Sequence, residues 1–252
     1  MSTDAPQQQL PVVSNLTIAP LEYYEPVEGP IVDHIVTEND VPVDNLFSEK
    51  QQRLLTEPLY SSWKPDVPFL TMANVGLFYS ASFPPLVPIV LLSMDVVAPS
   101  DLFPKSNRSY FVWEYGKPPD VVIEIVSNKE GNEATKKFQG YARGGVDYYM
   151  IYDPFKYLSK EIVRFYECRG GVFQLIDDES HPMPSIGLGF KVWEGTFEGH
   201  VDRWLRWTDL AGNLILTGAE LAAAERTRAD TERTRAEALA EQLRRLGIKP
   251  EN

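Results

Sequence analysis

The stretch from residue 120 to residue 129, DVVIEIVSNK, decides the fold of this chain. Its β-branched apolar residues are typical of a buried β-strand. One acid, Glu124, stands in the middle of the run, and alternation along a strand places it on the same face as Val122 and Val126. A carboxylate buried there alone would be costly, so something has to compensate for its charge.

Three explanations for Glu124 are open. It faces solvent from an edge strand, it belongs to a structural ion pair, or it points into a cleft where a metal ion and a lysine use it. The helix expected next carries Lys136 and Lys137, and a strand–helix return can bring one of them back to Glu124. Sites of metal-dependent phosphodiester hydrolysis combine an acid with a lysine, because the acid holds the cation and the lysine stabilises charge on the phosphate.

Composition is that of a globular protein: 252 residues, 43% hydrophobic and 24% charged. The net charge of −12 counts against tight nonspecific binding to nucleic acid, but acidic metal-dependent nuclease sites are compatible with it. We find no export signal and no apolar run near the roughly 18 residues that span a bilayer, so we expect a cytoplasmic protein. The single cysteine excludes an internal disulfide, and the histidines lack zinc-ligand spacing: Cys168, His34, His181 and His200.

The order of the expected elements indicates an α/β fold in which a mixed sheet is flanked by helices. An irregular arm, 1–44, precedes them. We expect helices over 46–63 and 130–145, strands over 69–81, 86–97, 121–126, 147–154 and 187–195, a hairpin over 162–176, and a long loop over 98–118.

The end of the chain, from Gly218, is rich in alanine, glutamate and arginine, and ERTRADT is followed at once by ERTRAEA. This period of seven predicts a long helix whose seam is Ala222, Ala229, Ala236 and Leu243. Two interpretations stay open: weak coiled-coil pairing in a homodimer, or a solvated single helix held by acid–base pairs.

Three stretches together resemble a known family: PPDVVIEIVSN (118–128), ATKKFQGYARGGVDYYMIYDP (134–154) and GLGFKVWEG (187–195). They are similar to the Uma-type family of restriction endonucleases, in the PD-(D/E)XK nuclease superfamily. The resemblance covers about 45–215, and the tail LRRLGIKPEN also looks like tails in this family. It implies a restriction-endonuclease-like domain over 45–215, after the arm and before a C-terminal helix over 216–252, with DNA as substrate and Mg²⁺ or Mn²⁺ as cofactor.

The resemblance also implies site residues. The family glutamate falls on Glu124, and the family lysine on the following helix falls on Lys137, with Lys136 a weaker candidate. Val126 stands where the superfamily places its lysine. Where the family reads Pro-Asp, with the aspartate a metal ligand, this chain has Pro88 followed by Ile89.

No aspartate is a good substitute for that ligand. Asp95 lies about 20 Å along its strand from position 89, and Asp120 about 13 Å from Glu124. Glu49, on the first helix, is a further possible metal ligand or a solvated residue, and Asn74 offers a neutral oxygen. Metal binding is therefore expected to be weakened or absent.

Two functions follow. One is a metal-dependent DNA endonuclease acting through Glu124 and Lys137. The other is a catalytically degenerate nuclease-fold protein, acting as a binding or assembly module because Ile89 replaces a ligand. Aromatic residues over 110–115 either stack on bases or cover the sheet, and Arg143 contacts phosphate or caps its helix.

Overall fold

The computed structural model describes residues 45–80, 83–104, 107–127, 136–177 and 182–247. The chain divides into a unit Met1–Val36 and a unit Thr37–Asn252, and all described residues belong to the second. The predicted arm, 1–44, lies outside the described residues.

A six-stranded mixed sheet is the centre of the fold, in the order β1-β3-β5-β6-β7-β8. The expected mixed α/β fold is thereby confirmed. β5 and β6 run parallel, whereas their other neighbours are antiparallel. The strands are β1 (Phe69–Ala73), β3 (Val90–Met94), β5 (Val121–Ile125), β6 (Tyr148–Tyr152), β7 (Val163–Arg169) and β8 (Val172–Leu175).

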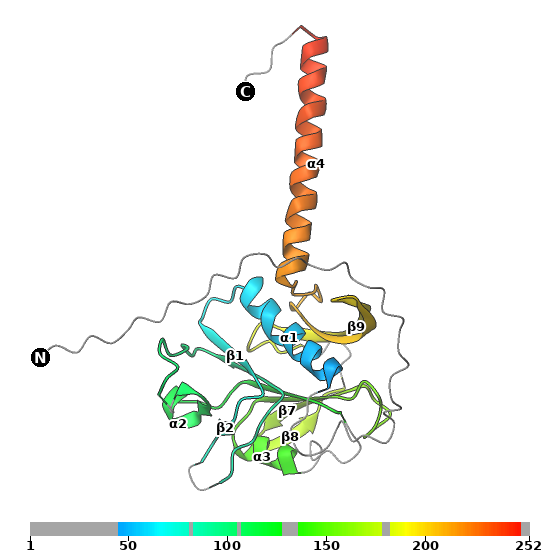
Figure 1. Ribbon diagram of the computed structural model, residues 1–252. Helices are drawn as coiled ribbons and strands as arrows, with labels where there is room; N and C mark the ends of the chain where they lie inside the picture. The colour runs from blue at the N-terminus through cyan, green and yellow to red at the C-terminus, as the bar shows by residue number, and fades with distance from the viewer. Residues whose placement is uncertain (1–44, 81–82, 105–106, 128–135, 178–181, 248–252) are drawn as a thin grey trace, which may run out of the picture. The chain divides into compact units, whose positions relative to one another are not determined.

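Two helices cover opposite faces of this sheet (Figure 1). α1 (Leu46–Ser61) buries Leu55 and Leu59 in the larger core cluster, together with Val121, Ile123 and Ile125 of β5. Asn45 caps its first turn by accepting from the Ser48 amide. α3 (Phe138–Arg143) buries Tyr141 and Ala142 in the smaller cluster, which contains Val122 and Val126. Alternation along β5 thus divides the core into two layers, and Glu124 belongs to the layer under α3.

Other predicted elements differ from the structure. The strand expected over 69–81 is split into β1 and β2 (Leu77–Phe78), because Asn74 takes a left-handed conformation with φ +54°. The loop expected over 98–118 contains β4 (Tyr110–Phe111), parallel to β2, and the short helix α2 (Val112–Tyr115). Tyr110 in this segment is fully buried, as expected for a residue that covers the sheet, whereas Trp113 is half exposed.

A separate two-stranded sheet follows, formed by β9 (Gly189–Phe197) and β10 (His200–Thr208), of which only β9 was predicted. It packs on α1: the Gln51 side chain bonds to the backbone of Leu205, and the Trp207 indole donates to the Leu55 carbonyl. The last element, α4 (Gly218–Arg245), begins at a capping box between Thr217 and Glu220. Within the described residues, no helix is both long and apolar enough to cross a membrane.

Candidate active site

Glu124 lies in β5 between β3 and β6, and none of its surface is exposed. The edge-strand explanation is therefore wrong. Its carboxylate accepts a hydrogen bond at each oxygen: from Lys137 Nζ at 3.0 Å and from the Tyr141 hydroxyl at 2.6 Å. The charge of this buried acid is thus compensated by an ion pair and a hydroxyl donor.

Lys137 and Tyr141 reach Glu124 from the same side of one helix. They are four residues apart, so about one helical turn separates them. The chain enters α3 through a π-helical turn at Lys136 and Lys137. Lys137 keeps 27% of its side chain exposed, and its Nζ also approaches the Val87 carbonyl at 3.5 Å. The ammonium therefore links the buried carboxylate to solvent, while the adjacent Lys136 is exposed.

Tyr141 was not among the predicted site residues. Its spacing of four from Lys137 was the available signal, because it places both side chains on one helical face. An aromatic residue at that spacing is usually a core residue, however, and Tyr141 is also that: it is fully buried in the cluster under α3. Only the hydrogen bond from its hydroxyl to Glu124 distinguishes Tyr141 from an ordinary core residue.

The backbone of Ile89 lies beside that of Glu124. In the antiparallel register Val90 is paired with Ile123, and one further step places position 89 opposite position 124. Ile89 is half buried and packs against the larger core cluster. The position at which the family resemblance implies an aspartate therefore carries an apolar side chain, and that side chain packs on the α1 face of the sheet rather than in the layer under α3 that contains Glu124.

Neither aspartate takes over this position. Asp95 is exposed just beyond the far end of β3. Asp120 accepts from the Met94 amide at 2.8 Å and pairs with Lys117 at 2.7 Å, so it holds the end of β3 against the start of β5. Both observations agree with the expectation that these two aspartates lie too far along their strands.

The structure does not bring Glu49 to Glu124, contrary to the expectation of a shared metal site. α1 packs on the opposite face of the sheet from α3, and the Glu49 carboxylate accepts from Arg53 at 2.6 Å on the surface. Asn74 does lie near position 89, since its amide donates to the Ile89 carbonyl at 3.1 Å. Its side-chain amide donates to Gln52 at 3.1 Å.

The site around Glu124 offers a divalent cation one carboxylate, the smallest number that protein Mg²⁺ sites use. Among the described residues, no group of three histidine, cysteine, aspartate or glutamate side chains is placed to hold a metal. Mg²⁺ sites use one or two carboxylates and complete their shell with water and substrate phosphate. Glu124 supplies one such carboxylate, already bonded to Lys137 and Tyr141, so a cation would compete with these two donors.

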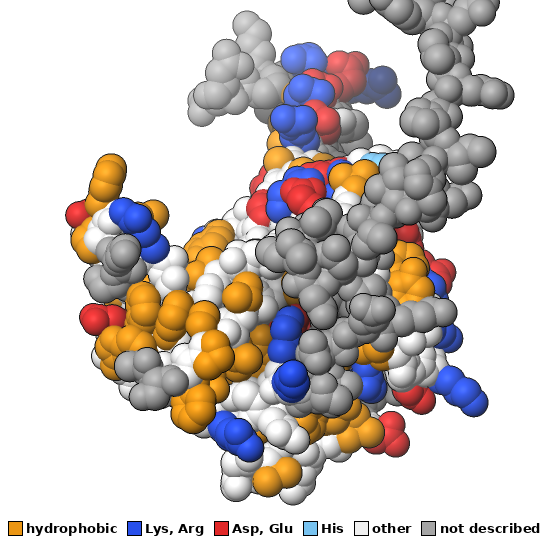
Figure 2. Space-filling view, turned by 60° about the horizontal axis from the view of Figure 1, so that its bottom comes forward, with side chains coloured by type: hydrophobic (Ala, Val, Ile, Leu, Met, Phe, Trp, Pro, Cys, Tyr) orange, Lys and Arg blue, Asp and Glu red, His pale blue; other side chains and the backbone are white. Residues whose placement is uncertain are grey.

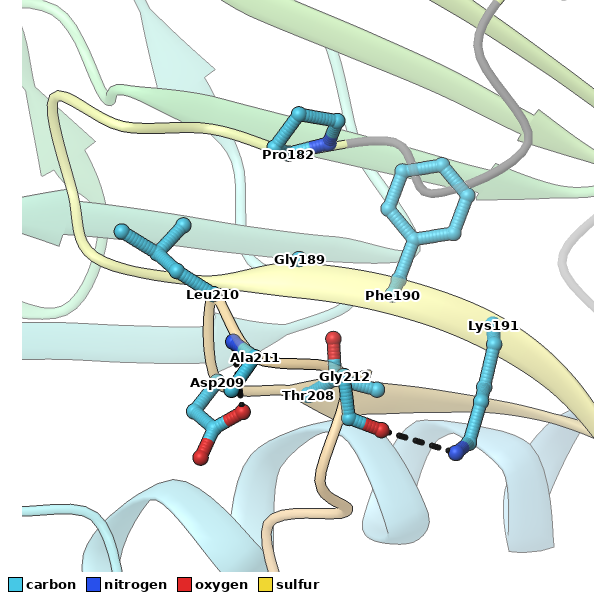
Figure 3. Close-up of a pocket in the computed structure, with 9 residues that line it drawn as sticks. All are labelled: Pro182, Gly189, Phe190, Lys191, Thr208, Asp209, Leu210, Ala211 and Gly212. Carbon is cyan, nitrogen blue, oxygen red and sulfur yellow. Dashed lines mark hydrogen bonds between the residues drawn. The ribbon is translucent and has the colours of Figure 1, made fainter.

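A pocket of about 220 Å³ lies elsewhere, between the β9–β10 pair and the turn after β10 (Figure 3). Its two charged side chains are bonded within the protein: Lys191 donates to the Gly212 carbonyl at 2.9 Å, and Asp209 accepts from the Ala211 amide at 2.9 Å. Hydrogen bonds to the Asp209 carboxylate, first of all from the side chain and backbone of Asn213 and then from the Ala211 amide, lower the pKa of Asp209. None of the predicted site residues lines this pocket.

Comparison with known proteins confirms the resemblance found in the sequence. Residues 95–184, which include Glu124, Lys137 and Tyr141, match the family Uma2, described as "Putative restriction endonuclease". No curated protein matches the chain. One solved structure with a similar chain is a "putative nuclease belonging to DUF820" from Anabaena variabilis, at 17% identity and a TM-score of 0.39, over 57% of this chain and 76% of that one.

Proposed function

We propose that this chain is a DNA endonuclease that acts through Glu124 and Lys137 with Mg²⁺ or Mn²⁺, and that Ile89 weakens its hold on the cation. The observation that carries the proposal is the Glu124–Lys137 pair: a fully buried carboxylate on a central strand, 3.0 Å from the ammonium of a lysine whose side chain is 27% exposed. The match of residues 95–184 to a restriction endonuclease family supports the reaction class.

Each residue of the pair has a separate role. Glu124 fixes the Lys137 ammonium at the border between core and solvent, and there a phosphate oxygen can approach it and have its charge stabilised. Tyr141 holds the second carboxylate oxygen and so sets the orientation of Glu124. A cation bound at Glu124 would polarise the phosphate and acidify a bound water.

A second candidate function, DNA binding without cleavage, is favoured by Ile89. Position 89 supplies no carboxylate, so the proposed pair contains one, Glu124, which is the minimum for Mg²⁺. A protein with this site can still bind a phosphate through Lys137 without cleaving the phosphodiester bond.

Nicking of supercoiled plasmid with Mg²⁺ or Mn²⁺ tests both candidates. The proteins to compare are wild type, Lys137→Ala, Ile89→Asp and, as a matched control, Lys191→Ala, whose lysine lies outside the site. Wild-type nicking that Lys137→Ala abolishes and Lys191→Ala retains would support the endonuclease. We expect Ile89→Asp to raise the rate at least tenfold and to lower the Mg²⁺ concentration required.

The other outcomes are equally clear. A silent wild type with an active Ile89→Asp variant would establish the second candidate, a nuclease fold whose site is switched off by one residue. If neither protein nicks although both are folded by circular dichroism, the endonuclease proposal fails. Nicking that persists in Glu124→Gln would point to a contaminating nuclease.

A further inference from the structure

A loop with two stacked aromatic rings lies against α3, the helix that carries Lys137. The loop is closed by Leu77 and Leu86, whose backbones exchange hydrogen bonds of 2.7 Å and 3.0 Å. Leu86 packs so closely on α3 that a Cβ added at Gly140 would lie 2.8 Å from its Cδ1. The loop is therefore fixed on the helix at its closed end.

The rings belong to Tyr79 and Phe83, with centroids 6.0 Å apart and planes 13° from parallel. Phe83 is 58% exposed. A single exposed phenylalanine needs no explanation on a protein surface. An exposed ring held nearly parallel on a half-buried second ring is different, because it presents a flat π-surface of the kind on which nucleic-acid bases stack.

The loop also adjoins the candidate site. The Val87 carbonyl, one residue beyond the closing pair, lies 3.5 Å from Lys137 Nζ. Val87 is four positions after Phe83, and a chain of that length extends at most about 14 Å. The exposed ring is thus within a few nucleotides of a phosphate placed at Lys137.

The charge along this part of the chain suits a nucleic-acid backbone, although the whole protein carries −12. Residues 136–146 contain three basic side chains, Lys136, Lys137 and Arg143, and no acidic one. Lys136 and Arg143 are exposed. The bottom of Figure 1, where α3 lies, comes forward in Figure 2, and there Lys and Arg side chains stand beside an area of hydrophobic ones.

We propose that the ring pair of Tyr79 and Phe83 is a stacking platform for unpaired bases, so that the substrate is single-stranded DNA or the single-stranded part of a junction. This inference rests on the proposed function for its ligand class and specifies the substrate of the same site. Bases inside a duplex already stack on each other and cannot lie on Phe83, whereas a single strand can place a base on the ring and its phosphate at Lys137. The acidic remainder of the protein repels DNA elsewhere, which makes the local contact decisive.

Binding without cleavage tests the platform separately from catalysis. Fluorescence anisotropy in EDTA would compare a labelled 20-nucleotide single strand with its duplex, for wild type, Phe83→Ala, Phe83→Leu and Phe83→Trp. We expect wild type to prefer the single strand, Phe83→Ala and Phe83→Leu to weaken single-strand binding at least about fivefold, and Phe83→Trp to retain it. Duplex binding should be the same in all four proteins.

Phe155→Ala is the matched control, since Phe155 is 47% exposed and contacts Phe47 of α1, on the other face of the sheet. It should bind like wild type. Equal affinity of wild type for single strand and duplex, or single-strand binding by Phe83→Leu as tight as by wild type, would overturn the platform. If plasmid nicking is absent but the Phe83-dependent preference holds, the endonuclease proposal fails and the platform stands.

Discussion

Removing the hydroxyl of Tyr141 is the smallest substitution that tests how much the candidate site contributes to the stability of the protein. This hydroxyl donates at 2.6 Å to a carboxylate that is fully buried, and a hydrogen bond to a charged group contributes about 1.5–3 kcal/mol. We expect Tyr141→Phe to lower the free energy of unfolding by about 2 kcal/mol, because one oxygen of Glu124 loses its donor in the core. Urea unfolding followed by circular dichroism measures this loss.

Tyr148 provides the comparison for that prediction. Its hydroxyl lies 3.1 Å from the Ser185 hydroxyl, a neutral pair, and a bond of this kind contributes about 1 kcal/mol. Tyr148→Phe should therefore cost about half as much as Tyr141→Phe. Equal losses in the two variants would mean that Glu124 does not carry a charge that needs the Tyr141 donor.

A second tyrosine, Tyr110, makes stability depend on alkaline pH. Burial raises the pKa of Tyr110 to about 12 from the model-compound value of 10.0. The folded state thus holds the phenolic proton more tightly than the unfolded state, so this contribution is complete below pH 10 and is lost as the pH rises toward 12. Thermal unfolding at pH 8, 10 and 11.5 should show a steeper fall for wild type than for Tyr110→Phe; parallel curves would contradict this assignment.

At the scale of elements, an ion pair with a buried guanidinium is one of the contacts that attach α4 to the rest of the fold. Arg206 of β10 is 1% exposed, donates to both oxygens of Glu220 at 2.7 Å and 2.6 Å, and lies 4.8 Å above the Trp193 ring. Glu220 also closes the capping box with Thr217. Burial opposes the charged form of Glu220, but the bonds from Arg206 and Thr217 outweigh it and lower the pKa of Glu220.

Glu220→Ala should therefore destabilise the protein by about 3 kcal/mol, because it leaves a buried guanidinium without its carboxylate and removes half of a helix cap. Glu232→Ala is the matched control on the same helix, where the side chain is exposed, and it should change stability by less than about 0.5 kcal/mol. Chemical denaturation gives both values. A loss below 1 kcal/mol in Glu220→Ala would show that α4 is attached by other contacts.

The elements that sequence predicts best are those whose pattern depends on local chemistry alone. β6 is an uninterrupted apolar run and β5 is interrupted only by Glu124; both are bounded by polar residues or proline, and both form as expected. β2 and β4 were missed as a pair because each is two residues long and their pairing joins Leu77 to Tyr110 across 33 positions. β10 was missed because its burial, exposed at His200 and buried from Trp204 to Thr208, follows from packing on α1 rather than from alternation.

The candidate site was predictable to the extent that neighbours in sequence determine it. Lys137 returns to Glu124 through a short strand–helix connection, and an ion pair between the two residues forms. The prediction that Glu49 shares a metal site with Glu124 was wrong because the sequence of α1 does not say which face of the sheet the helix covers. The apolar stripe of α1, with Leu55 and Leu59, packs on the face opposite α3. That position 89 is a neighbour of Glu124 depends on the β3–β5 register, which propensity does not specify.

At the scale of the whole molecule, α4 is the one long element that buries no residue within the described chain. Its 28 residues extend about 42 Å, and its heptad seam is Ala222, Ala229, Ala236 and Leu243. Alanines bury little area, so self-association through this seam stays a prediction of weak pairing: a monomer at low micromolar concentration and a growing dimer fraction at higher ones.

Leucine substitutions in the seam test whether the heptad period of α4 directs pairing. Ala229→Leu combined with Ala236→Leu adds apolar area where a second copy would pack, and it should tighten dimerisation at least about tenfold in sedimentation equilibrium. Thr227→Leu with Thr234→Leu is the matched control, because it adds the same side chains two positions away, off the seam. If the control pair dimerises as strongly as the seam pair, the association is nonspecific and the heptad period does not direct pairing. If neither pair dimerises, α4 is a solvated single helix held by its acid–base pairs, and cleavage of both DNA strands cannot depend on a dimer formed through it.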